Sequence, residues 1–122
     1  MQLKECYDVF GGDYESVRQR MPREQMIRKF VLRFLSDPSY ELLCSSLESR
    51  NYEEAFRAAH SLKGVCQNLG FQRLEKTVSA MTELLRKWNE AQIDEEQAQL
   101  LFEQVSEDYK LVVETIGQLD EE

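Results

Sequence analysis

Residues 52–69 contain two contrasting stripes of side chains, and these stripes constrain the fold more than any other feature of the sequence. With a helical rotation of about 100° per residue, small apolar side chains recur along one face. That face consists of Ala55, Ala59, Leu62, Cys66 and Leu69. The second face, about 120° away around the helix axis, consists of Phe56, His60, Lys63, Gly64 and Gln67, and we call it the His60 face. The first face predicts packing against other helices in a bundle, with the His60 face left outside the core.

Three further apolar stripes predict the other helices of the bundle. The first runs from Pro22, which suits a first helical position, to Arg50, and Asp37-Pro38 within it predicts either a kink or a new helix capped by Asp37. Its wide apolar arc favours core burial over exposed apolar surface. The second stripe consists of Leu74, Val78, Met81, Leu84, Leu85 and Trp88. The third stripe consists of Ala98, Leu101, Val105, Tyr109, Val112 and Ile116.

Local signals mark the ends of these helices. Asn51 begins the helix that carries His60, and Asp94 begins the last helix, each as the first residue of a capping-box pattern. Gly70 is placed to end the His60 helix in the left-handed conformation. The very short connection after Gly70 predicts that the next helix is its antiparallel neighbour.

The predicted fold class is all-α, an antiparallel up-down four-helix bundle with one or two short N-terminal helices. We expect one domain over residues 1–122, with the short helices in 1–21 and the bundle in 22–119. Residues 2–10 form the first short helix, which stops at Gly11-Gly12, and Asp13 caps the second, which ends near Arg20. Few glycines, two prolines and abundant helix-forming residues agree with this class.

Charge and composition exclude several classes of protein. A net charge of −8 argues against nucleic-acid binding, which needs a basic surface. No apolar run reaches the roughly 18 residues of a membrane span, and the first residues do not resemble a signal peptide. Cys6, Cys44 and Cys66 are odd in number and lack a Cys-x-x-Cys pair, so we expect free buried thiols in a reducing compartment. We therefore expect a cytoplasmic protein that does not bind membranes, and a monomer.

His60, the only histidine, is the candidate reactive residue. An exposed imidazole is a competent nucleophile at neutral pH. Gly64 lies one turn away in a helix interior, where glycine costs about 1 kcal/mol relative to alanine, so it indicates a need for space. Lys63 and Gln67 offer a cation and amide donors for an anionic group. Phe56 is expected either to hold the imidazole ring or to form part of a docking surface.

Other chemistries fit these residues poorly. Metal binding is disfavoured because no carboxylate or thiol lies near His60 on its face. A hydrolase is disfavoured because Ser61 points about 100° away from the imidazole and no nucleophile elbow is present. No nucleotide-binding glycine pattern occurs either, so we expect no kinase activity and no cofactor in this chain.

The segment His60-Ser61-Leu62-Lys63-Gly64, followed by Asn68-Leu69-Gly70 and Leu74, resembles the signature of histidine-containing phosphotransfer (HPt) domains. The resemblance extends from about Pro22 to the C-terminal helix. It implies that His60, through Nε2, takes a phosphoryl group from a receiver-domain aspartate and passes it to another receiver in two-component signalling. It further implies that Lys63 and Gln67 assist the phosphoryl group and that Gly64 makes room for it. Cys66 departs from the small Ser or Ala usual in the family, and its size suits the core.

The resemblance also implies partners and a docking surface. The expected partners are receiver domains of response regulators or hybrid histidine kinases, which would supply Mg²⁺ from their acidic pocket. Phe30 and Phe34, together with Phe56, are the candidate docking residues. Residues 18–33 are rich in basic side chains that suit an acidic partner, whereas residues 90–122 are strongly acidic. The basic residues are Arg18, Arg20, Arg23, Arg28, Lys29 and Arg33.

The sequence thus predicts a phosphocarrier, a phosphorelay intermediate rather than an enzyme with its own turnover. The alternative is a helical interaction module that docks receiver domains or other partners without carrying phosphate.

Overall fold

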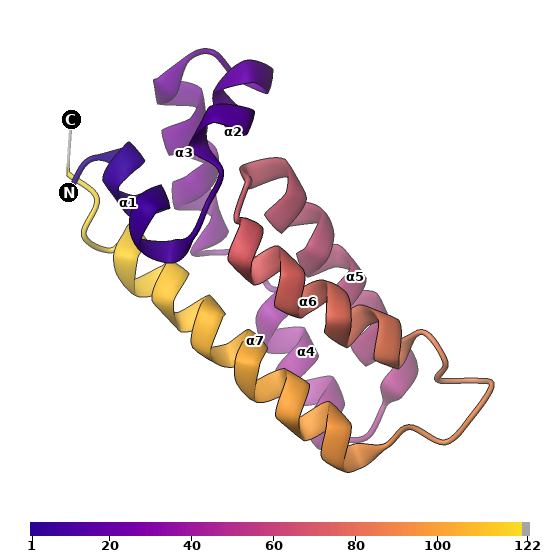
Figure 1. Ribbon diagram of the computed structural model, residues 1–122. Helices are drawn as coiled ribbons and strands as arrows, with labels where there is room; N and C mark the ends of the chain where they lie inside the picture. The colour runs from indigo at the N-terminus through magenta and orange to yellow at the C-terminus, as the bar shows by residue number, and fades with distance from the viewer. Residues whose placement is uncertain (121–122) are drawn as a thin grey trace.

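The computed structural model describes residues 1–120, in which every regular element is an α-helix. In chain order the helices are α1 (Leu3–Phe10), α2 (Tyr14–Arg20), α3 (Glu24–Phe34), α4 (Ser39–Glu48), α5 (Tyr52–Leu69), α6 (Gln72–Leu85) and α7 (Glu95–Ile116) (Figure 1). The all-α prediction is therefore confirmed. None of these helices, within the part of the chain that is described, is both long and apolar enough to cross a membrane.

Helices α4 to α7 form the four-helix bundle. Helix α5 packs between α4 and α6, and α7 packs on α6. Helix α7 also meets α4, where the rings of Tyr40 and Tyr109 stack with centroids 3.8 Å apart. The bundle is therefore closed, with α7 diagonally opposite α5. The acidic helix α7 accordingly lies across the bundle from α5, the helix that carries His60.

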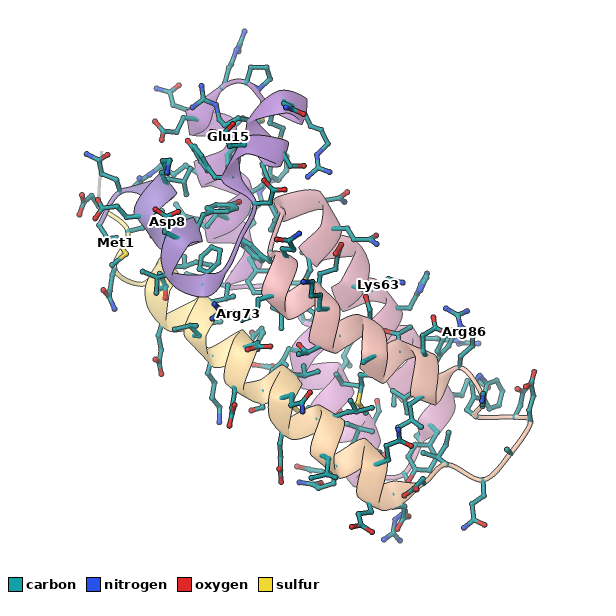
Figure 2. All side chains as sticks on the ribbon, viewed as in Figure 1. Met1, Asp8, Glu15, Lys63, Arg73 and Arg86 are labelled. Carbon is teal, nitrogen blue, oxygen red and sulfur yellow. The ribbon has the colours of Figure 1, made fainter. Side chains whose placement is uncertain are left out.

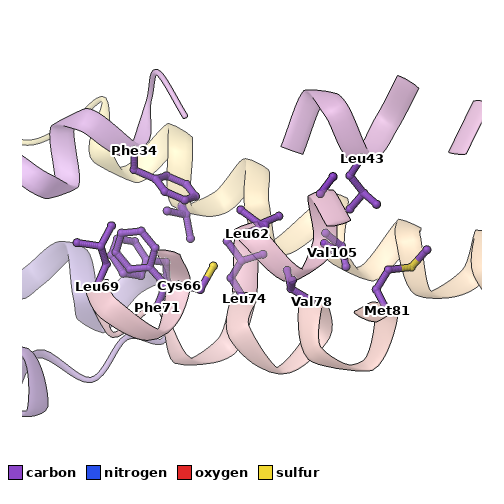
Figure 3. Close-up of a cluster of buried hydrophobic side chains, with 14 of the residues drawn as sticks. Phe34, Leu43, Leu62, Cys66, Leu69, Phe71, Leu74, Val78, Met81 and Val105 are labelled. Atoms are coloured by element: carbon purple, nitrogen blue, oxygen red, sulfur yellow. The ribbon is translucent and has the colours of Figure 1, made fainter. Parts of the chain in front are cut away.

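The core of the bundle contains the apolar stripe predicted for α5. All five of its residues, Ala55, Ala59, Leu62, Cys66 and Leu69, are buried. They belong to one cluster with apolar residues of the other helices, and Figure 3 shows three of them, Leu62, Cys66 and Leu69, within it. Cys66 and Cys6 are buried free thiols, and Cys44 is a half-buried one. Burial raises the pKa of the Cys66 thiol, which keeps it protonated and unreactive.

The predicted helix starts at Asn51, Asp94 and Asp13 are confirmed. Asn51 Oδ1 accepts a hydrogen bond from the Glu54 backbone N–H (3.2 Å), and Asp94 Oδ1 accepts one from Gln97 N–H (3.1 Å). Asp13 caps α2 in the same way, by accepting from Ser16 N–H. Each cap satisfies a backbone donor that has no partner within its own helix.

The α1–α2 loop is anchored on the α5–α6 turn, and we call this contact the N-terminal junction. The Asp13 N–H donates to the Gly70 carbonyl (2.8 Å), and the Arg73 N–H donates to the Gly11 carbonyl (3.1 Å). The Tyr7 hydroxyl donates to the Leu69 carbonyl (2.6 Å). Gly70 itself has φ = 68°, the left-handed conformation predicted for it. The junction thus fixes the N-terminal helices to the C-terminal end of α5.

The long segment from Pro22 to Arg50 forms two helices, which decides between the alternatives left open at Asp37-Pro38. Helix α3 ends at Phe34 and α4 begins at Ser39, whose N–H donates to Asp37 Oδ1 (2.9 Å). The four bundle helices therefore begin at Ser39 and not at residue 22. The prediction that Pro22 is the first residue of a helix was also wrong, because α3 begins at Glu24 with Arg23 as its N-cap.

Trp88 does not belong to the core stripe of α6. The α-helix ends at Leu85, and the chain continues through turns in which Trp88 is 36% exposed. Leu74, Val78, Met81 and Leu85 are buried as expected. The apolar pattern thus continues past the end of the helix, so periodicity alone predicts a helix that is too long.

Candidate functional site

His60 lies in the middle of α5 with its side chain exposed to solvent. The Phe56 ring, one turn earlier, stacks on the imidazole with centroids 6.0 Å apart and an angle of 23° between the planes. No residue of the described range 1–120 forms a hydrogen bond with the imidazole, so neither ring nitrogen is masked by the fold. Phe56 therefore packs against the ring, and the imidazole remains open to solvent.

Gly64 leaves open space beside His60. A Cβ atom built at Gly64 would have no heavy atom within 4 Å apart from the adjacent helix backbone. Its backbone has ordinary helical geometry and needs no positive φ. Neither packing nor conformation requires glycine here, so the space next to the imidazole is the remaining explanation for a residue that weakens the helix.

Lys63 and Gln67 share the His60 face, as predicted. Lys63 is half-buried, and it makes no ion pair shorter than 4.0 Å with any residue from 1 to 120, although its charge contributes to lowering the pKa of Glu83. The Gln67 side chain is exposed. Both side chains are thus available to an anionic group bound at His60.

Arg86 is a second cation near His60, and the sequence patterns did not single it out. It follows α6, and its guanidinium carbon lies 5.1 Å from the centroid of the Phe56 ring. Because Phe56 also stacks on His60, Arg86 and the imidazole are neighbours of the same ring. Figure 2 shows Lys63 and Arg86 along the same edge of the molecule. Counting outward from the Gly70 turn would have placed Arg86 level with Phe56, since α5 and α6 are antiparallel.

A groove of about 480 Å³ borders the C-terminal half of α5. Its lining is Arg20, Met21, Phe30, Arg33, Phe34, Asp37, Val65, Asn68 and Leu69. Arg20 donates from Nη2 to the carbonyls of Gln67 and Asn68, at 3.1 and 3.0 Å. Part of the basic segment therefore lies directly beside the His60 face, as the charge pattern predicts.

The two phenylalanines expected to dock a partner have different positions. Phe30 is half-buried, and the Arg33 guanidinium lies over its ring (5.4 Å). Phe34 is only 2% exposed and packs edge-on against Phe71. Phe34 is therefore a core residue that forms the floor of the groove, and almost none of its side chain is exposed to a partner. Periodicity could not separate the two faces of α3 because its apolar arc covers both.

Leu42 is an apolar surface residue that the sequence reasoning missed. It lies on α4, is 51% exposed, and lines a small hollow with Ala58 and Ser61 of α5. The hollow lies on the α4 side of α5, whereas Arg86 lies on the α6 side. The same hollow is also lined by Glu54 and Arg57, so the α4 side of α5 presents both apolar and charged side chains.

Residues 1–120 contain no group of three or more His, Cys, Asp or Glu side chains arranged to hold a metal ion.

Comparison with known proteins gives one match. The family model described as "Hpt domain" matches residues 36–121, which include all of α4 to α7. No curated protein and no solved structure matches the chain. The matched range contains the whole His60 face and omits the helices α1 to α3.

Proposed function

Because the chain belongs to the Hpt domain family, we propose that His60 accepts a phosphoryl group from the aspartyl phosphate of one receiver domain and passes it to another. Hpt domains are phosphocarrier modules of two-component systems and interact with receiver domains. The observation that carries the proposal is the exposed imidazole with open space at Gly64. A histidine that served only the fold would need neither feature.

The transfer uses one nitrogen of the imidazole as the nucleophile. The lone pair of Nε2 forms a bond to phosphorus while the bond between phosphorus and the aspartate oxygen breaks, and the electron pair leaves with the carboxylate. The imidazolium then loses its Nδ1 proton to water. The reverse sequence transfers the group to the second receiver. Because the transition state is mainly stabilised by position and charge, the chain needs no catalytic base of its own.

The neighbours of His60 have separate parts in this transfer. The Lys63 ammonium stabilises the charge on the phosphoryl oxygens, and the Gln67 amide adds a hydrogen-bond donor. Gly64 leaves the incoming phosphoryl group and the receiver's active-site loops room to approach. Mg²⁺ comes from the acidic pocket of the receiver, where carboxylate oxygens are the ligands it prefers.

We expect the receiver to dock on the α3–α4 side of His60. Phe30, Leu42 and Val65 offer apolar surface there, and Arg20 and Arg33 form a basic rim. An apolar centre with charged residues at its edge is typical of a transient interface. The basic rim suits a partner whose active site is acidic, and such charge complementarity mainly speeds association.

The direct test is incubation with a receiver labelled with radioactive phosphate on its aspartate, in the presence of Mg²⁺. We expect acid-labile, alkali-stable label on this chain, which a second, unlabelled receiver then removes. The His60→Gln variant should take up no label, whereas Ser61→Ala, a matched change one residue away, should keep it. Tight receiver binding with no label would instead favour an adaptor that carries no phosphate. Neither binding nor label would contradict both functions.

A further inference from the structure

Glu83 and Arg86 form an exposed ion pair at the edge of the His60 face. Arg86 donates from Nε to Glu83 Oε2 (3.3 Å) and from Nη2 to Glu83 Oε1 (3.2 Å). The guanidinium also lies over the Phe56 ring. Both side chains are at least half exposed, so the pair contributes little to the stability of the fold. Through the Phe56 ring, which both Arg86 and His60 contact, the pair lies one side chain away from the imidazole.

The Glu83 carboxylate interacts electrostatically with two cations, Arg86 and Lys63. Its pKa is lowered first by the hydrogen bond from Arg86, then by the charge of Arg86, and further by the charge of Lys63. Lys63 belongs to the His60 face, and Arg86 contacts the same ring as His60. A phosphoryl group on His60 would thus compete with Glu83 for the same two cations.

We infer that Glu83 is a positioning residue that holds Arg86 while His60 is unmodified, and that Arg86 moves from Glu83 to the phosphoryl oxygens when His60 is phosphorylated. This inference rests on the proposed function of His60. A phosphoryl group carries a charge of about −1.5 to −2 and three acceptor oxygens, so it attracts a guanidinium more strongly than one carboxylate does. The exposed Glu83–Arg86 pair is weak enough to exchange.

The exchange gives the α6 side of His60 a role distinct from that of the α3–α4 side. The α3–α4 side receives the partner, whereas the α6 side neutralises the group that the partner delivers. Arg86 already packs on Phe56. A change in the conformation of its long, flexible side chain would therefore bring the guanidinium to the new anion. Glu83 keeps the cation nearby and lowers its availability until the phosphoryl group arrives.

The first experiment tests the exchange without any receiver. Phosphoramidate can transfer its phosphoryl group to the imidazole of the whole chain with loss of ammonia. We then expect the NMR resonance of the Arg86 Nε–H group, which donates to Glu83 in the unmodified chain, to move on phosphorylation. Arg50 is the matched control, because its Nε pairs with Glu95 at 2.8 Å near the start of α5, and its resonance should stay in place. An unmoved Arg86 resonance in a chain known to carry phosphohistidine would overturn the inference.

The second experiment measures the equilibrium between receiver aspartyl phosphate and phosphorylated His60. Arg86→Ala should shift it toward the receiver by about two- to fivefold, the range of an exposed charge pair, and Arg86→Lys should recover part of the shift. Glu83→Gln should shift it the opposite way by a similar factor. Asp8→Asn, which breaks the exposed Lys4–Asp8 pair of α1, should leave it unchanged.

A double variant separates action through Arg86 from direct repulsion by Glu83. If Glu83 acts through Arg86, the effect of Glu83→Gln should disappear in the Arg86→Ala background. An effect of full size in that background would contradict the inference. A wild-type chain that takes up phosphate from phosphoramidate but from no receiver would contradict the proposed function and leave the NMR test valid.

Discussion

The N-terminal junction and the His60 face both contain a glycine on or next to α5, and the two glycines have opposite surroundings. At Gly70 the backbone has φ = 68°, and a Cβ atom would collide with Val17 Cγ2 and with the Asp13 carbonyl. At Gly64 the backbone is ordinary helix, and a Cβ atom would meet nothing within 4 Å. The fold therefore requires the first glycine and only tolerates the second.

This difference separates residues that serve folding from residues that serve another purpose. Every unusual feature of the junction has a partner that explains it, such as Tyr7, whose hydroxyl bonds to the Leu69 carbonyl. On the His60 face the imidazole has no hydrogen bond within residues 1–120, and the nearby glycine costs the helix stability. Features that the fold leaves unexplained are where function is expected.

The largest predicted effect is the loss of phosphotransfer in His60→Gln. Because His60 is exposed and its imidazole forms no hydrogen bond within residues 1–120, its replacement should change the free energy of unfolding by less than about 0.5 kcal/mol. Labelling from a phosphorylated receiver, by contrast, should fall to background. Urea denaturation and the labelling assay measure the two quantities on the same preparation. A strongly destabilised His60→Gln variant would show that His60 belongs with the residues that serve folding.

The second prediction concerns Gly70→Ala, which should destabilise the fold by about 2–4 kcal/mol. Left-handed backbone costs an L-residue roughly 1–2 kcal/mol, and the collision with Val17 and the Asp13 carbonyl adds a packing cost of similar size. Urea denaturation with an unchanged m-value measures the loss. Labelling of the fraction that remains folded should be normal. Wild-type stability would mean that the junction is less constrained than its geometry indicates.

Much of the fold follows from local signals in the sequence. The stripe of Ala55, Leu62 and Cys66 repeats with helical periodicity, so its burial could be predicted without any tertiary information. Asn51 and Gly70 act on the backbone next to them, so that Asn51 begins α5 and Gly70 ends it where expected. These features depend on residues a few positions apart, which is the range over which sequence patterns are informative.

The features that the sequence did not reveal depend on contacts between helices. Arg86 reaches the Phe56 ring because of the register between α5 and α6, which follows from the length of the Gly70 turn and not from the periodicity of either helix. Phe34 faces the core and Leu35 faces solvent, yet both belong to one wide apolar arc. Trp88 continues the stripe of α6 after the helix has ended. In each case the missing information is the position of a second element.

The third prediction is that Gly64→Leu blocks phosphotransfer without unfolding the chain. The new side chain has open space to occupy, so the bundle should remain folded, but it should obstruct the approach to His60. We expect labelling to slow by about tenfold or more, equivalent to roughly 1.4 kcal/mol in the barrier. Normal transfer in this variant would remove the explanation for the glycine.

Gly64→Ala is the milder counterpart of that change and sharpens the comparison with Gly70→Ala. The same substitution should stabilise the fold at Gly64, by about 0.5–1 kcal/mol, because alanine has the better helix propensity and no clash opposes it. Urea denaturation should therefore show a higher free energy of unfolding for Gly64→Ala and a lower one for Gly70→Ala, relative to the wild type. If Gly64→Ala destabilised the chain, the two glycines would serve the same purpose and the contrast between the regions would fail.

The smallest predicted effect belongs to Lys63→Ala. Lys63 has no close ion pair among the described residues, so the substitution should leave the free energy of unfolding almost unchanged. Phosphotransfer should slow by about two- to fivefold, which is the effect of losing one partly exposed charge. Lys63→Arg should retain most of the rate, since the cation is preserved. Lys110→Ala is the matched control, because Lys110 lies on α7, diagonally across the bundle. If both alanine variants transferred phosphate at the wild-type rate, the Lys63 cation would have no part in the reaction, and stabilisation of the phosphoryl group would fall to Arg86 and the receiver's Mg²⁺.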